Sequence, residues 1–399
     1  VTVLTRSKAA GWTAALLWVA CPALHVFGRF FFYPFLLAVL FCLLLWTGVR
    51  FVANGRGGWL IGVAVVLGAI CNLRALYPPL WALAVAGLLI AGRLRRADRG
   101  AFCSSRGAAV AAAAVLVVLL GAWPLKNRVL FGQATWSSWR GYNLSRKTGL
   151  VDAYFRAHRP RRLARHELEE FARRHPRLDL EVIERVTRRD GTVNWNHYQF
   201  LILNRDLTPR AIRWRLEHPG RWLDMAWRYY LQWSQATFAN PYTGEVRGPE
   251  TAAYRLYAAA IRHTVYLDLG TVLERTVGWL ERDWMDIRRP LVPAPLFGLV
   301  LFPLFLAAAS WFSLREWRSR STAGAAGVLI LFCIAWVLAV PCLTDGHEGN
   351  RMRFAVQPLM IALLVVMVLH WWRRRTAAAK RGTNGGARQD ADMPRTATC

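Results

Sequence analysis

The sequence predicts an all-α integral membrane protein with about eight transmembrane helices and a mostly helical extracytoplasmic domain between spans five and six. Of its apolar segments, five lie before a polar block at residues 124–290 and three follow it. The composition agrees, because 55% of residues are hydrophobic, 20 are tryptophan and the mean hydropathy is +0.21. Short arginine clusters also fall on alternate connections between the segments.

The N-terminal membrane bundle, residues 1–123, is expected to hold about five spans. Its third and fourth apolar segments are short for a span of ~20 residues, which leaves a tilted helix pair and a partly re-entrant hairpin as alternatives. The expected segments are 10–27, 30–46, 59–71, 77–91 and 107–123.

The polar block, residues 124–290, is expected to form an extracytoplasmic helical domain. It begins where the fifth apolar segment ends, at Trp123-Pro124, and interfacial aromatic residues follow. Apolar residues at helical spacing predict helix within 166–186.

Two further helices are expected in this block. Thr208 resembles a helix cap with Pro209 in the first turn, so one helix is expected to begin there. An amphipathic helix is expected over 221–233, and its apolar face suits a neighbouring element or the membrane surface.

The C-terminal membrane bundle, residues 291–373, is expected to hold three spans, at 291–312, 323–342 and 354–372. The tail at 374–399 is rich in Gly, Ala and Arg and lacks apolar periodicity, so it is expected to be a disordered basic cytoplasmic tail.

Charge placement predicts the orientation. With eight spans, the arginine clusters at 50–56, 93–99, 315–320 and 373–375 all fall on one side. The positive-inside rule makes that side the cytoplasm, so both termini are expected there. We therefore expect a multi-pass protein of the cytoplasmic membrane, with the polar block and the 344–353 loop outside.

Several function classes lack support in the sequence. The net charge of +28 comes mostly from arginine, without a basic stripe interleaved with aromatic residues, so no nucleic-acid partner is expected. The seven cysteines include no CxxC pair. No zincin, P-loop, nucleophile-elbow or dinucleotide motif is present.

The candidate chemistry lies on the outer face. Arg74, between two apolar segments, suits either a cavity or interfacial water. The 344–353 loop contains Asp345, His347, Glu348, Arg351 and Arg353. Its acids and imidazole suit acid–base work or a divalent metal, and its arginines suit a phosphate. The alternative is a hydrated hairpin whose charges pair with each other.

Three passages resemble a known family. Residues 124–144 read PLKNRVLFGQATWSSWRGYNL, 211–234 read AIRWRLEHPGRWLDMAWRYYLQWS, and 348–364 read EGNRMRFAVQPLMIALL. Their order and their positions relative to the spans resemble the GT-C class of integral membrane glycosyltransferases, in particular the bacterial branch akin to protein mannosyltransferases.

The resemblance implies a polyprenyl-phosphate-linked sugar donor, transfer outside the membrane and inversion without a covalent intermediate. An acid would act as base on the acceptor, and cations would stabilise the departing lipid phosphate. The expected phosphate ligands are Arg74, Arg128, Arg351 and Arg353. Glu348 matches the family's motif and is expected to support the site, with Asp345 as a nearby candidate base. Tyr142 and Asn143 are expected to position the acceptor or the domain.

The chain departs from this family in one respect. The family carries an acidic motif in its first outer loop, whereas here no acid precedes Asp98, which falls on the cytoplasmic side. We therefore expect that an N-terminal span and first outer loop are missing, and that residues 1–399 alone do not transfer sugar. The alternative function is a non-catalytic membrane protein that binds or translocates lipid-linked saccharide during envelope assembly.

Overall fold

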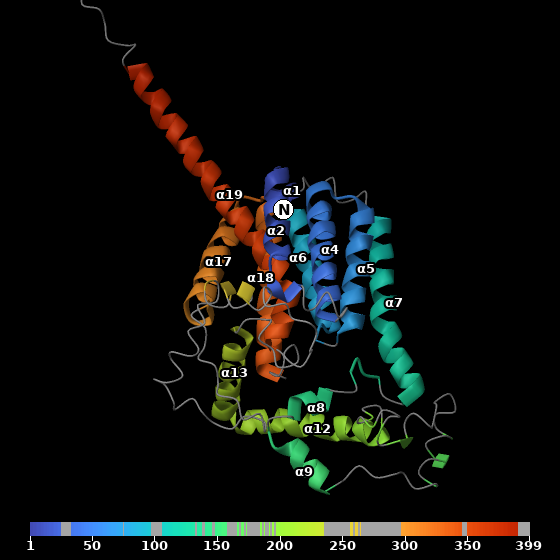
Figure 1. Ribbon diagram of the computed structural model, residues 1–399. Coiled ribbons are helices and arrows are strands. Elements are labelled where there is room, and N and C mark those ends of the chain that lie inside the picture. Colours follow the sequence, from blue (N-terminus) through green and yellow to red (C-terminus); the bar gives the residue numbers. More distant parts are fainter. Residues whose placement is uncertain are drawn as a thin grey trace, which may run out of the picture.

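The computed structural model describes the membrane bundle almost completely and the polar block in part. Described residues are 1–24, 33–74, 76–96, 106–131, 134–137, 140–145, 148–157, 166, 169, 170, 173, 184, 185, 187, 191, 194, 197–234, 256, 257, 260, 261, 264, 297–344 and 349–389. Within these residues every regular secondary-structure element is a helix (Figure 1). The all-α prediction is confirmed for this part of the chain.

Each predicted apolar segment contains a helix. Those before the polar block are α2 (Lys8–Val19), which follows the single turn α1 (Thr2–Thr5), then α4 (Tyr33–Asn54), α5 (Gly57–Leu73), α6 (Pro79–Arg96) and α7 (Arg106–Phe131). Those after it are α17 (Phe302–Arg318), preceded by the π-helical turn η4 (Phe297–Leu301), α18 (Thr322–Thr344) and α19 (Gly349–Gln389).

Five helices of the described chain are long and apolar enough to cross a membrane: α4, α7, α17 with its preceding turn, α18 and α19. Helix α5 is apolar but has only 17 residues, α2 has 12, and α6 carries three arginines in its last turn. These helices indicate a multi-pass membrane protein. The count of eight spans stays a prediction.

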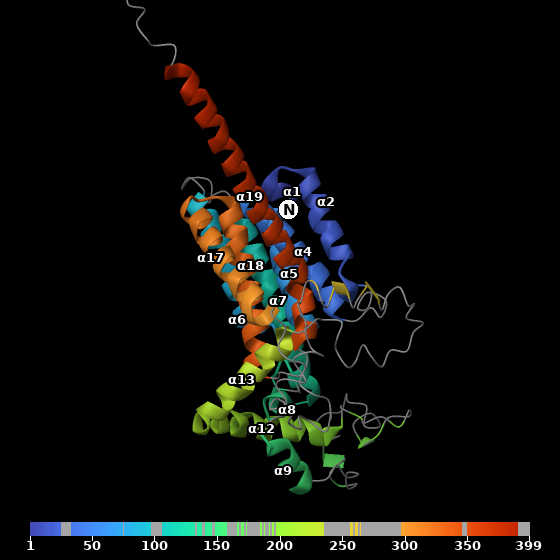
Figure 2. The ribbon, with the colours of Figure 1, turned by 60° about the vertical axis from the view of Figure 1, so that its left-hand side comes forward.

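Helix α4 lies at the centre of the bundle and packs on α5, α6, α18 and α19 (Figures 1 and 2). Close approach of α5 to α7 depends on Gly68, where an added Cβ would lie 2.5 Å from the Leu119 side chain. One helical turn further on, the Asn72 side-chain amide donates to Leu119 O at 2.9 Å. Small and polar residues therefore join these two helices, as is usual where lipid removes the hydrophobic drive for association.

Helix α7 does not end at Trp123-Pro124, as the sequence suggested, but continues through Pro124 to Phe131. Proline has no N–H, so it leaves the carbonyl four residues earlier, that of Leu120, without its helical donor. The Trp136 indole N–H donates to this carbonyl at 3.1 Å. A residue beyond the helix thus replaces the missing hydrogen bond.

The polar block contributes four helices among its described residues: α8 (Arg140–Ser145), α9 (Leu150–Ala157), α12 (Tyr198–Glu217) and α13 (Pro219–Ser234). Val151, Leu203 and Leu207 form a small core between α9 and α12. The helix expected to start at Thr208-Pro209 begins ten residues earlier, at Tyr198, with Pro209 inside it. Helix α13 confirms the amphipathic prediction. The helices expected within 166–186 fall mostly outside the described residues.

The arginine clusters gather at one end of the bundle, here called the arginine end. Arg93 Nη1 donates to Val52 O at 3.4 Å, and the Arg95 guanidinium lies 5.3 Å from the Trp317 ring. Helix α19 extends beyond this end to Gln389, so residues 374–389 are helical where disorder was expected. Helices α8, α9, α12 and α13 lie at the opposite end, here called the domain end (Figure 2).

Candidate functional site

Arg74 lies at the domain end, where it follows the last residue of α5. Its guanidinium lies 4.4 Å from the centre of the Tyr33 ring, at the start of α4. The Tyr33 hydroxyl in turn lies 4.0 Å from Met352 Sδ, in the first turns of α19. Stacking on an aromatic face stabilises a guanidinium while leaving its planar N–H edge oriented outward from the ring. This chain of contacts connects Arg74 to the residue beside Arg353.

Arg353 is almost completely buried, with 1% of its surface exposed. Its Nη1 donates to Trp233 O at 2.8 Å, and its guanidinium lies 5.3 Å from the Trp233 ring and 5.1 Å from the Phe297 ring. Trp233 is in the last turn of α13, where carbonyls lack helical donors and a positive charge is favourable. Arg353 therefore fixes the C-terminal end of α13 against α19 and η4.

Two of the arginines predicted to bind phosphate, Arg74 and Arg353, thus lie at the domain end, although they are far apart in sequence. They are connected only indirectly, through Tyr33 and Met352. Both guanidinium groups lie against aromatic rings, in surroundings with little access to water at Arg353. A low local dielectric strengthens attraction between such a cation and an anion. The arrangement suits an anionic group presented at the membrane boundary.

Sequence reasoning missed Arg215, which is 7% exposed and joins three helices. Its guanidinium donates to Ala211 O at 3.0 Å in its own helix, to Leu144 O in α8 at 2.7 Å and to Thr344 O in α18 at 3.3 Å. Leu144 and Thr344 lie in the last turns of their helices, so one cation caps two C-termini.

A signal for Arg215 exists in the sequence. Leu203, Leu207, Ala211 and Arg215 follow one another at intervals of four and are all buried on α12. An arginine that ends an apolar stripe at this spacing is predicted to face the same packed surface. Burial lowers the pKa of its guanidinium below the ordinary value. An arginine nevertheless stays charged in a protein.

Helix α13 makes two more contacts to the ends of membrane helices. The Trp222 indole N–H donates to Leu343 O, near the end of α18, at 3.1 Å. The Tyr230 hydroxyl donates to Gly298 O in η4. Together with Arg215 and Arg353, these bonds hold the domain helices on η4, α18 and α19.

The other predicted residues are placed as follows. Arg128 lies on the exposed last turn of α7. Tyr142 and Asn143 are half-buried in α8, and Tyr142 packs on the small core of α9 and α12, which suits domain positioning. Arg351 belongs to the first turn of α19, but its side chain lies outside the described part, as do Asp345 and Glu348.

No group of three or more His, Cys, Asp or Glu residues that could hold a metal is found among the described residues. His347, Asp345 and Glu348, whose side chains suit either a divalent metal or acid–base work, are outside them. The metal therefore stays a prediction about that loop.

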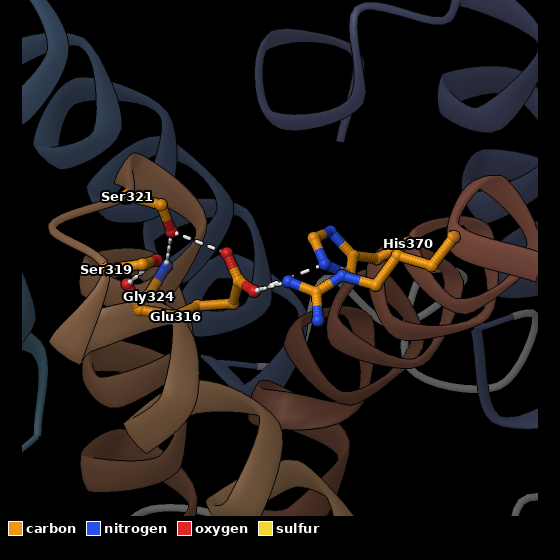
Figure 3. Close-up of polar contacts among 6 residues, drawn as sticks. Glu316, Ser319, Ser321, Gly324 and His370 are labelled. Atoms are coloured by element: carbon orange, nitrogen blue, oxygen red, sulfur yellow. Dashed lines mark hydrogen bonds and ion pairs between the residues drawn. The ribbon is translucent and has the colours of Figure 1, made fainter. Parts of the chain in front are cut away.

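A second polar cluster lies at the arginine end (Figure 3). Glu316 is 5% exposed and joins α17 to α18 and α19. Its carboxylate accepts hydrogen bonds from Ser321 Oγ at 3.0 Å and Arg374 Nη2 at 3.1 Å. Nε2 of His370 lies 3.2 Å from Oε1, close enough for an ion pair but not aligned as a hydrogen bond. This cluster is far from the domain end. It connects the end of α17 with α19 and with the residue before α18, at the arginine end.

Comparison with protein-family models, with curated proteins and with solved structures finds no match to this chain. A function must therefore be argued from its residues and their geometry.

Proposed function

We propose that the chain is a GT-C-type membrane glycosyltransferase, which transfers a sugar from a polyprenyl-phosphate donor to an acceptor outside the cytoplasmic membrane. One observation supports the proposal: Arg74 and Arg353 lie at the same end of the bundle, and contacts through Tyr33 connect Arg74 to Met352, the residue before Arg353. A lipid-linked donor keeps its phosphate at the membrane boundary, where these cations lie.

The roles follow from the chemistry of the departing group. Arg74 and Arg353, with Arg351 and Arg128, bind the phosphate and stabilise the charge that develops on it as the sugar leaves. A carboxylate takes the proton of the acceptor hydroxyl. In this chain Glu348 supports the site, and Asp345 is the candidate base.

A second function is favoured by the described acids of the domain helices. Asp206 lies 3.1 Å from Arg205 and Asp224 lies 2.9 Å from Arg228, so both are held in ion pairs with neighbouring arginines. Neither acid lies on the helices that end or begin near Arg74 and Arg353, α5 and α19. Such acids suit a protein that binds or translocates a lipid-linked saccharide without transferring the sugar.

Proteoliposomes that contain residues 1–399 and a radiolabelled polyprenyl-phosphate hexose separate the two functions. An acceptor with a free hydroxyl is added. Release of polyprenyl phosphate with transfer of the hexose to this hydroxyl, abolished by Asp345→Asn and retained by Arg318→Gln at the arginine end, makes the protein a transferase with Asp345 as base. Release only by an N-terminally extended chain places the base upstream. Exchange of the donor between leaflets without release supports the second function. If neither release nor exchange is observed, both functions are contradicted.

A further inference from the structure

Helix α13 has one packed face and one exposed face. Tyr229 and Trp233 on the packed face are 4% and 0% exposed. On the other face, Leu223 and Trp227 are 60% and 52% exposed, although both are large and apolar. Such a face needs a partner, because burying a leucine or aromatic side chain is favourable by roughly 1.5–3 kcal/mol.

The contacts of α13 place it at the level of the membrane boundary. Trp222, near its beginning, bonds to Leu343 O at the end of one candidate span, and Tyr230, near its end, bonds to Gly298 O at the start of another. In Figure 1, α13 accordingly lies below α17 and beside the lower end of α18. Helix α13 runs steeply in both views, and its two contacts keep it at the level where these two spans end (Figures 1 and 2).

The exposed face of α13 lies next to exposed apolar residues of η4 and α17. Leu299, Val300 and Leu304 are 49%, 40% and 61% exposed on the first turns of that span. Tyr230 bonds to the residue just before them and stacks on Trp227, with ring centres 5.4 Å apart. Exposed apolar residues therefore occur on both sides of the contact between Tyr230 and Gly298.

The charges around this face favour an anionic surface. The exposed corner between α12 and α13 contains three arginines against two acids, one of which, Asp224, is paired with Arg228. The arginines are Arg210, Arg213 and Arg221, and the acids are Glu217 and Asp224. Amphipathic helices with arginine beside tryptophan and leucine bind at the headgroup layer, and attraction to anionic lipids adds to apolar burial.

We infer that α13 is an interfacial helix whose Leu223 and Trp227 insert below the headgroups while Arg221 binds anionic phospholipid. This surface would hold the domain end against the membrane, independently of whether the bundle binds a polyprenyl phosphate. Tryptophan at the boundary and arginine beside lipid phosphate each match the chemistry of that layer.

Photocrosslinking in purified proteoliposomes of phosphatidylglycerol and phosphatidylethanolamine tests the inference. Leu223 and Trp227 are replaced one at a time by the photoreactive residue p-benzoylphenylalanine, which is also apolar and aromatic. The matched control is the same replacement of Ala153, which is exposed on α9 at the far side of the domain. After irradiation, mass spectrometry identifies what each position has captured.

The expected result is a phospholipid adduct at 223 and 227 and none at 153. In the Arg221→Gln variant the share of phosphatidylglycerol among the adducts should fall by about fivefold, the factor for one arginine near an anionic surface, whereas Arg156→Gln on α9 should leave it unchanged. A crosslink to a second copy of the chain at 223 and 227, or no lipid adduct at either, overturns the inference. An unchanged share in Arg221→Gln overturns the anionic preference.

Discussion

At the scale of single residues, buried charge in this protein is used to join helix ends. Arg215 and Arg353 direct guanidinium groups at carbonyls of terminal turns, and Glu316 accepts hydrogen bonds from Ser321, just before α18, and from Arg374 in α19. A carbonyl in a last turn has no helical partner, so such bonds satisfy groups that would otherwise be costly away from water.

The Glu316 cluster gives a prediction for stability. Glu316→Gln keeps the shape but removes the charge that Arg374 and His370 face, so we expect a loss on the order of 1–3 kcal/mol. The value is at the lower end because 46% of the Arg374 side chain is exposed and screened by solvent. Thermal unfolding in detergent measures it. The control is Arg318→Gln, at an exposed position two residues later in α17. Equal melting temperatures for the two variants would contradict a stabilising role of the Glu316 charge.

His197 gives a prediction for pH. Burial lowers its pKa below the ordinary value of 6.5, against a smaller opposite effect of a backbone hydrogen bond with Glu184. Below pH 6.5 the unfolded chain therefore binds a proton that the folded chain does not yet bind, so stability falls as the pH falls. We expect the melting temperature of the parent to drop more steeply than that of His197→Gln below this pH. Parallel curves for the two proteins would show that His197 is not responsible.

At the scale of elements, whether a helix continues past a proline depends on which group replaces the lost backbone hydrogen bond. In α7 the Leu120 carbonyl opposite Pro124 is satisfied by Trp136, which allows the helix to continue beyond the expected boundary. Local sequence marks the proline but not the distant donor.

A double-mutant cycle tests this account of α7. Trp136→Phe removes the indole N–H and should cost about 1 kcal/mol in the parent. In a Pro124→Ala background the alanine N–H bonds to Leu120 O, so the same change should cost much less. Melting temperatures of the four proteins give the coupling. Equal costs in both backgrounds would mean that the indole bond does not compensate for the proline.

At the scale of the whole molecule, the bundle has two chemically different ends. One carries the arginine clusters and the Glu316 cluster, and the other carries the domain helices with Arg74 and Arg353. If the positive-inside rule holds, the first faces the cytoplasm.

Cysteine labelling tests this orientation. Ala153 on α9 and Ala378 on α19 are exposed, whereas Asn194 is buried and bonded to Arg185 O and is a poor labelling site. We expect an impermeant maleimide to label Ala153→Cys on intact cells and Ala378→Cys only after permeabilisation, both measured above the parent. The reverse pattern would invert the topology.

Much of this organisation could be predicted from the sequence, because apolar length and arginine placement are local properties. Each predicted apolar segment contains a helix, and the arginine clusters between the segments lie at one end of the helix bundle. The roles of Arg215 and Arg353 could not be predicted in this way. Their partners, Leu144, Thr344 and Trp233, are 71, 129 and 120 residues away and are backbone carbonyls, which leave no mark in side-chain composition.

The central claim, that the domain end binds a polyprenyl phosphate, is tested most directly by measuring binding of polyprenyl monophosphate to the protein in lipid nanodiscs. We expect Arg74→Gln and the double variant Arg351→Ala/Arg353→Ala each to lose roughly 2–5 kcal/mol of binding, at least about thirtyfold in affinity. Arg318→Gln at the arginine end should bind as the parent does. Melting temperatures separate lost binding from lost packing, because Arg353 also caps α13. Parental affinity in both the Arg74 and the double variant would contradict the claim.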